Sequence, residues 1–300
     1  MAAKTNVTTS AQFTTSAREV DFVSRFADNW DALRNIMGIM RPIRKAPGTK
    51  LVSYKASVDG GLKGGTVDEG DEIPFTKMKV EPVAYGDIDI SKYAKSVTIE
   101  SVAKYGADVA VEKTDEAFLV ALQNKVLTDF YAFLGTGTLK VTEKTWQRAL
   151  AMAKGKVLDK FAGLDKDVTE VVGFANIIDA YDYLGDKEIT VQTMFGINYV
   201  ENFMGYRTLF LLPEKYIASK TVIALPVENI DLYYVDPSDS DFAKLGLNYT
   251  VKGETNLIGV HVDGDYSRAT GDMYAIMGMK LWAEYLDGIA VATVSVAGAG

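Results

Sequence analysis

The chain has 300 residues, and 48% of them are hydrophobic, which is enough for one large core or two joined ones. Its formal net charge of -8 argues against a sequence-independent duplex binder, because such a protein presents a basic face. The chain contains no cysteine, which excludes disulfides and thiolate metal sites. There is no apolar core of a secretory signal and no bilayer-length apolar run. We therefore expect a cytosolic protein with no membrane partner.

The first predicted element is a helix that follows a polar tail, residues 1–15. Ser16 and Glu19 have the spacing of a capping box, so a helix should follow and end near Gly38. One apolar stripe runs along it at spacings of three and four. The stripe consists of Phe22, Phe26, Trp30, Leu33 and Met37. Two interpretations stay open: the helix packs on its own domain, or it belongs to an N-terminal arm that packs partly on a neighbour.

The next segment, residues 48–86, predicts a long two-stranded arm. Val52, Tyr54, Ala56 and Val58 alternate with polar residues, and the alternation returns over residues 77–81. This is the period of a strand with one wet face. The intervening residues are mostly turn-formers and charges.

The expected reach of this arm exceeds the size of the chain's own body. Two sides of about 15 residues, at roughly 3.3 Å per residue, extend about 50 Å. A compact chain of this length has a radius of gyration of about 19 Å. Because an isolated hairpin is at best marginally stable in water, we expect the arm to lie on a neighbouring copy.

A strand and a long helix are predicted after the arm. Residues 87–90 and 93–99 alternate as strands, and a helical turn at 100–105 ends at Gly106. Asp108 is a plausible N-cap for a helix over 109–134, about 39 Å long at 1.5 Å per residue. Its stripe consists of Phe118, Leu119, Leu122, Val126, Phe130 and Phe133. A helix with one long stripe is expected to support a sheet.

A second region is expected to begin at the break formed by Gly135, Thr136 and Gly137. Thr142 can cap a helix that runs through Phe161, and Asn176 can cap a helix over 177–184. Strands are predicted at 168–174, 189–194, 208–212, 221–225, 231–235 and 257–262.

The C-terminal segment, 272–296, is expected to return to the first region. Asp287 and Gly288 lie between two apolar runs, a strong signal for a hairpin. The strands of this hairpin would pack on the long helix. Residues 138–271 would then form an insertion in a discontinuous domain.

No motif in the sequence supports catalysis. His261 is the only histidine and has no supporting motif. Gly60 and Gly65 have the spacing of a phosphate loop, but Thr66 stands where that loop needs lysine. Two acidic clusters lack the spacing and glycine of a calcium loop. The first cluster consists of Asp68, Glu69, Asp71 and Glu72. The second consists of Asp236, Asp239 and Asp241. The first cluster could instead pair with basic residues of another subunit. We expect neither an enzyme nor a cofactor or metal site.

The order of these parts along the chain points to one family. A capped N-terminal helix precedes a long hairpin that contains the sequence VDEGDEIP at 67–74, and a strand leads into VTIES at 97–101. A long helix and the break at 135–137 follow. Together these parts resemble the major capsid proteins of tailed bacteriophages, whose architecture is called the Hong Kong ninety-seven fold. Residues 194–206 look like part of the axial domain in capsid proteins of siphovirus type.

The resemblance implies an α+β fold with four parts. These are an N-terminal arm with its helix (1–47), an extended loop (48–86), a peripheral domain (87–137 and 272–300, spine helix 109–134) and an axial domain (138–271). Such subunits self-assemble as hexamers and pentamers into an icosahedral shell around the double-stranded DNA genome. The protein would be assembled in the host cytoplasm and reside in the virion.

The resemblance also implies which residues meet other molecules. Contacts from the extended loop would involve Tyr54, Lys55, Lys63, Asp68, Glu69, Asp71 and Glu72. Contacts from the arm helix would involve Phe22, Phe26 and Trp30. Expected partners are copies of the chain, a portal protein and packaged DNA without sequence-specific binding, with a decoration protein left open. Because the chain retains Met1, a separate scaffolding protein is expected.

Some relatives crosslink a loop lysine to an asparagine of a neighbour. Lysines are available here in the extended loop, but Asn124 is the only asparagine in the expected peripheral domain. We therefore expect no covalent mesh. Two alternatives to a phage capsid remain: the shell protein of an encapsulin nanocompartment, and a soluble enzyme or binding module of mixed class.

Overall fold

The computed structural model describes residues 17–185, 191–194, 197–227, 229–253 and 255–295. The helices are α1 (Ala17–Met37), α2 (Ile99–Tyr105), α3 (Lys113–Gly135), α4 (Trp146–Ala162), α5 (Ile177–Leu184) and α6 (Ser240–Ala243). The first seven strands are β1 (Met40–Arg44), β2 (Leu51–Asp59), β3 (Lys77–Gly86), β4 (Ile90–Thr98), β5 (Leu139–Glu143), β6 (Val171–Asn176) and β7 (Gln192–Met194). The others are β8 (Ile197–Glu201), β9 (Thr208–Leu212), β10 (Thr221–Pro226), β11 (Ile230–Val235), β12 (Ile258–Asp265), β13 (Thr270–Ala283) and β14 (Ala290–Val294). Among these residues, no helix is both long enough and apolar enough to cross a membrane.

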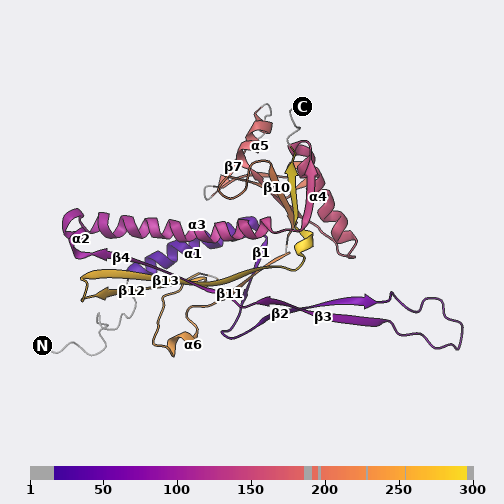
Figure 1. Ribbon diagram of the computed structural model, residues 1–300, viewed down its shortest axis with the longest axis horizontal. Helices are drawn as coiled ribbons and strands as arrows, with labels where there is room; N and C mark the ends of the chain where they lie inside the picture. The colour runs from indigo at the N-terminus through magenta and orange to yellow at the C-terminus, as the bar shows by residue number, and fades with distance from the viewer. Residues whose placement is uncertain (1–16, 186–190, 195–196, 228, 254, 296–300) are drawn as a thin grey trace, which may run out of the picture.

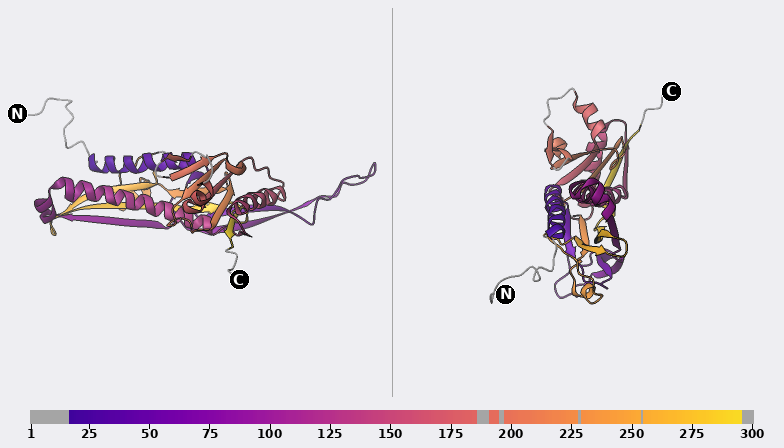
Figure 2. Two further views of the ribbon diagram at one scale, coloured as in Figure 1. Left: turned by 90° about the horizontal axis from the view of Figure 1, so that it is seen from above. Right: turned by 90° about the vertical axis from the view of Figure 1, so that its left-hand side faces the viewer.

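An elongated body, an upper lobe and a projecting arm make up the molecule (Figure 1). The body contains a five-stranded sheet in which the long strand β13 pairs with β4 on one side and with β12 and β11 on the other. Strand β1 joins β11 in parallel, and its Pro42 is tolerated because β1 lies at the edge of the sheet. Helices α1 and α3 run along this body (Figure 2).

The long helix is the element that the sequence predicted best. Leu119, Leu122, Val126 and Phe130 are buried at helical spacing, and they share one core cluster with strands of both sheets. Tyr131 and Leu134 are also buried, although the predicted stripe omitted them. The stripe therefore widens toward the C-terminal end of α3, where the upper lobe sits on the helix (Figure 1).

The start of the long helix differs from the prediction. Residues Asp108–Glu112 form a π-helical turn that leads directly into α3. The backbone of Ala107 is already helical, so Asp108 lies inside the helical segment and is not its N-cap. The short helix before it agrees with the prediction, because α2 ends at Gly106. Its N-cap, which was not predicted, is Thr98, whose hydroxyl accepts a hydrogen bond from the amide of Ser101 at 3.3 Å.

A seven-stranded sheet forms the upper lobe, in the order β5-β14-β10-β6-β9-β8-β7. One face packs on the C-terminal half of α3, where Phe174 of β6 meets Phe130 and Tyr131 edge to face. Helix α4 covers the other face with Ala149, Leu150, Ala153 and Val157, which are fully buried.

Two local predictions for this lobe had different outcomes. Asn176 caps α5 as predicted, because its side-chain oxygen accepts the amide of Ile178 at 2.9 Å. The prediction for Thr142 is wrong: Thr142 lies in β5 opposite Thr293, and Thr145 caps α4 instead. Strand β7 covers only Gln192–Met194 of the predicted strand, and residues 189–190 lie outside the described residues.

The sheet pairing contradicts the expected C-terminal hairpin and the expected limits of the insertion. Strands β13 and β14 belong to different sheets, and β14 completes the upper lobe between β5 and β10. Conversely, β11 and β12 join the body sheet, although both lie within 138–271. The predicted Asp-Gly hairpin turn is a 3-10 turn, Leu286–Gly288, that leads the chain from one sheet to the other. The chain therefore crosses between the two parts more often than a single insertion allows.

The glycine at the end of the break after α3 is required by packing. A Cβ on Gly137 would lie 2.6 Å from the carbonyl oxygen of Ile289, which is backbone and cannot rotate away. We expect Gly137→Ala to lower the free energy of unfolding by about 1–3 kcal/mol in urea titrations. Gly135→Ala is the control, since a Cβ at Gly135 meets nothing within 4 Å. Equal stability of the two variants would contradict this packing argument.

Candidate intersubunit contact surface

The arm is a two-stranded ribbon that leaves the body (Figure 1). Strands β2 and β3 pair with each other and with no other described strand. They have 9 and 10 residues, fewer than the roughly 15 expected on each side. The rest of the reach comes from residues 60–76, which lie between the two strands. Leu51, at the base, is the only arm residue in the described core.

One face of the ribbon is entirely apolar. Directly opposed residues of antiparallel strands share a face, and alternate residues return to it. The opposed pairs on this face are Val52 with Ala84, Tyr54 with Pro82, Ala56 with Val80, and Val58 with Met78. Tyr54 is 70% exposed, Val80 58% and Met78 57%. An apolar strip of this kind marks an interaction surface, so the ribbon needs a partner to cover it.

The opposite face of the ribbon is polar except for Val83 near its base. Lys55 is opposed to Glu81 in the register, and Asp59 forms an ion pair with Lys77 at 2.7 Å. Lys79 contacts Glu81 at 2.5 Å. Exposed pairs of this kind contribute about 1 kcal/mol at most. The ribbon therefore has one face suited to water and one that is not.

The tip of the arm carries the acidic cluster. The amide of Lys63 donates to the hydroxyl of Thr76 at 3.0 Å, and a turn brings the amide of Asp71 to the carbonyl of Asp68 at 3.1 Å. The acidic residues Asp68, Glu69, Asp71 and Glu72 are all exposed. Leu62 and Phe75 beside them are 87% and 90% exposed. The expected loop contacts thus fall into two groups, one along the ribbon and one at its tip.

The expected contacts of the N-terminal helix are contradicted by burial. Phe22, Phe26 and Trp30 are 3%, 1% and 5% exposed within this one chain. The ring of Phe22 lies 5.9 Å from that of Phe118 on α3. These side chains form part of the subunit's own core and leave no surface for a neighbour. These three residues therefore pack on the chain's own domain.

This placement predicts a stability effect for the helix. We expect Phe26→Ala to lower the free energy of unfolding by about 3–5 kcal/mol, as for other buried aromatic truncations. Urea unfolding followed by circular dichroism would measure it. A variant with native stability that fails only in assembly would show that Phe26 contacts a neighbour after all.

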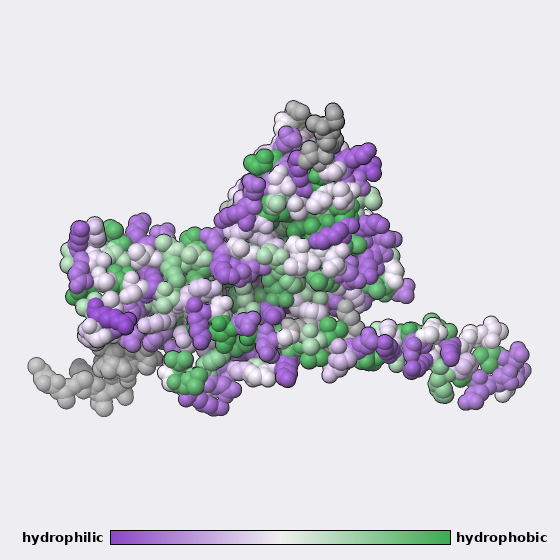
Figure 3. All heavy atoms as spheres, viewed as in Figure 1, coloured by the Kyte–Doolittle hydropathy of each residue, from purple (hydrophilic) through white to green (hydrophobic). Residues whose placement is uncertain are grey.

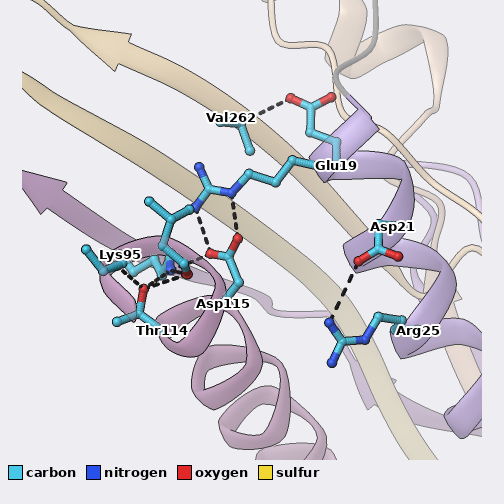
Figure 4. Close-up of polar contacts among 10 residues, drawn as sticks. Glu19, Asp21, Arg25, Lys95, Thr114, Asp115 and Val262 are labelled. Carbon is cyan, nitrogen blue, oxygen red and sulfur yellow. Dashed lines mark hydrogen bonds and ion pairs between the residues drawn. The ribbon is translucent and has the colours of Figure 1, made fainter. Parts of the chain in front are cut away.

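A charged junction at the far end of the body ties α1 to α3 and β4 (Figure 4). Arg18 donates to both carboxylate oxygens of Asp115, at 2.5 and 2.7 Å. Lys95 of β4 contacts the same carboxylate and donates to the hydroxyl of Thr114 at 2.6 Å. Arg18 and Asp115 are 97 positions apart in the sequence, so no local pattern reveals their pairing.

The junction shifts the pKa values of two of its groups. Burial acts to raise the pKa of Asp115, but hydrogen bonds from Arg18 and Lys95 outweigh it, and the pKa falls below its ordinary value. Burial lowers the pKa of Lys95 despite the opposing effect of Asp115. The Asp115 carboxylate is therefore stabilised in its charged form by the two cations beside it.

Glu19 fixes the first turn of α1 to β12. Its carboxylate accepts the amide of Val262 at 2.5 Å and the hydroxyl of Thr250 at 2.7 Å. The predicted capping partner, Ser16, lies outside the described residues. Nδ1 of His261 lies 3.5 Å from Glu19. The only histidine therefore takes part in a structural contact between the helix and the sheet.

The second acidic cluster makes contacts inside the chain. Asp236 and Asp239 lie 3.5 and 3.3 Å from the guanidinium of Arg44, and Asp241 pairs with Lys244 at 2.6 Å. Among the described residues, no group of three or more possible ligands is arranged to hold a metal ion.

Solved structures that resemble this chain include phage capsid chains and an encapsulin. A capsid chain of the cyanophage P-SCSP1u has a TM-score of 0.58 at 9% identity and covers 86% of each chain. A chain of the mature capsid of bacteriophage PhiM1 has a TM-score of 0.57 at 7% identity and covers 87% of each. The holo-SrpI encapsulin from Synechococcus elongatus has a TM-score of 0.51 at 12% identity and covers 96% of this chain and 95% of that one.

These similarities define the fold. No protein-family model matches the sequence, and no curated protein matches it. The expected α+β architecture of phage capsid proteins is confirmed by the structural matches.

Proposed function

We propose that this chain is the major capsid protein of a tailed bacteriophage of siphovirus type. Copies of it would assemble as hexamers and pentamers into an icosahedral shell around double-stranded DNA. The observation that carries the proposal is the exposed apolar face of the arm, on a chain with the phage capsid fold. A subunit that worked alone would leave this face in water, whereas a subunit in a shell can cover it with a neighbour.

The role proposed is assembly without turnover. Each intersubunit contact can be weak, because a subunit held at several places gains from effective concentration. A contact between two different surfaces produces a closed assembly only if the rotation between successive subunits returns to its starting point, and otherwise it produces an open filament. We therefore include a scaffolding protein and a portal protein among the proposed partners, with a decoration protein as a further one. The domain names peripheral and axial would apply to the body and the upper lobe.

Particle formation tests this proposal directly. The purified chain, alone and co-expressed with the neighbouring genes of its source, is examined by size-exclusion chromatography and negative-stain microscopy. We expect closed shells of uniform size. A stable monomer under all these conditions would refute the capsid function.

An encapsulin shell is the second candidate, because the SrpI encapsulin shares this fold along almost the whole chain. The contents of native particles separate the two functions. A phage capsid holds nuclease-protected DNA, and an encapsulin holds an enzyme. Absorbance ratios and mass spectrometry of native particles would distinguish them.

A further inference from the structure

Strand β4 forms an uncovered edge of the body sheet. It pairs with β13 over nine positions, from Ile90 to Thr98, and no strand in the described part of the chain pairs with its other side. In Figure 2, viewed from above, β4 runs along the outer margin of the body. An edge strand presents backbone N–H and C=O groups that another strand can pair with. With nine residues, this edge is long enough to accept one.

Of the two arm strands, β2 has the more complete outer edge. Pro82 interrupts β3, and a proline in a strand lies with its nitrogen away from the partner strand. The outer edge of β3 therefore lacks a donor at that position. Strand β2 contains no proline, and like β4 it has 9 residues. The two uncovered edges match in length.

We propose that β2 of one subunit pairs with β4 of a neighbouring subunit, so that the arm extends the neighbour's body sheet. This inference rests on the proposed function, which brings a second copy to the arm. It satisfies the backbone groups of two edges at once, as in other cases of β-strand addition. Both strands run roughly along the long axis of the molecule, and the arm projects beyond the end of its own body, where a second copy can lie (Figure 1).

The pairing also determines which face of the arm is buried. Tyr93, Lys95 and Val97 of β4 are half-buried on the side that carries α3, where Lys95 contacts Asp115, whereas Lys92, Ala94 and Ser96 are exposed on the other side. The apolar face of the arm joins Tyr93 and Val97, and its polar face continues the exposed side of β4. Hydropathy is mixed along the visible face of the arm, with hydrophobic and hydrophilic residues interleaved (Figure 3).

Introduced pairs of cysteines test this arrangement. Because the chain has no cysteine of its own, every disulfide that forms must involve an introduced residue. Ser57→Cys, on the polar face of the arm, is combined in turn with Lys92→Cys, Ala94→Cys and Ser96→Cys. Opposed residues of paired strands are close enough for a disulfide. In oxidised particles we expect multimer ladders on a non-reducing gel for at least one of these combinations. Ser57→Cys with Ser91→Cys, on the other face of β4, should give none.

Three controls complete this experiment. Each single-cysteine variant reports pairing of like residues, and Ser57→Cys with Ser240→Cys on α6 reports random contact. Hydrogen exchange of the alternate β4 amides that point away from β13 is compared between unassembled subunits and particles, and we expect their protection to rise only on assembly. Protection of these outward amides in the unassembled subunit would mean that its own chain covers the edge and would overturn the inference.

The outcomes separate this inference from the proposed function. Assembled particles without a ladder at any of the three positions would overturn the strand pairing and leave the capsid function standing. An equally strong ladder with Ser91→Cys would also overturn the pairing, because Ser91 lies on the face of β4 opposite to the one that should meet Ser57. A wild-type chain that never assembles would overturn both the strand pairing and the capsid function.

Discussion

Shortening the arm is expected to abolish closed shells while leaving the subunit folded. Ser53 and Val83 are opposed in the ribbon register, so an Asn-Gly turn can replace residues 54–82 without changing the base. The part removed contributes nothing to the described core. Circular dichroism and urea unfolding should match the intact chain, and microscopy should find no closed particles. Shells formed by the shortened chain would contradict the role of the arm.

Point variants show which face of the arm matters. Val80→Asp places a charge on the apolar face, and Lys79→Ser changes only the polar face beside it. The loss of one buried valine contact is worth about 1.5–3 kcal/mol, which weakens each contact by tenfold or more. We expect Val80→Asp to reduce particle yield sharply and Lys79→Ser to leave it nearly unchanged. A sharp loss of particles for Lys79→Ser with a normal yield for Val80→Asp would show that the polar face makes the contact.

Removing the central carboxylate of the charged junction is expected to destabilise the subunit by about 1–3 kcal/mol, because two half-buried cations lose their partner. In Asp115→Asn, the groups left without that partner are Arg18 and Lys95, from two other elements. Urea unfolding near neutral pH would measure the loss. The control is Asp21→Asn, whose pair with Arg25 spans 3.7 Å and is largely exposed (Figure 4). Its effect should be below about 0.5 kcal/mol.

The pH dependence of this difference follows from the lowered pKa of Asp115. A carboxylate with a folded-state pKa below its unfolded value stabilises the fold above the unfolded value, here 3.8. That contribution is lost as the pH falls from 3.8 through the folded-state pKa. The gap between the native chain and Asp115→Asn should therefore be constant above about pH 5 and shrink below 3.8. A constant gap at all pH values would show that the loss is not electrostatic.

Local patterns in the sequence determined the local structure of this protein. The alternation in the arm, the spacing of the stripe on α3 and the caps at Asn176 and Gly106 each depend on residues within a few positions. The exceptions are also local. Thr142, the predicted cap, pairs with β14 as part of β5, and Thr145 three residues later caps α4 with the same kind of hydroxyl.

Only the tertiary structure decided which strands pair and which faces are covered. An apolar strand can join any sheet, so the sequence placed β14 beside β13, whereas packing places it in the upper lobe. The stripe on α1 required burial, but its residues cannot specify whether their own chain or a neighbour supplies the cover. The same limit applies to the junction, whose partners lie far apart in the sequence. By itself, the sequence determined an arm in need of a partner and a long supporting helix. The folded chain determined that α1 is already covered and that the apolar face of the arm is not.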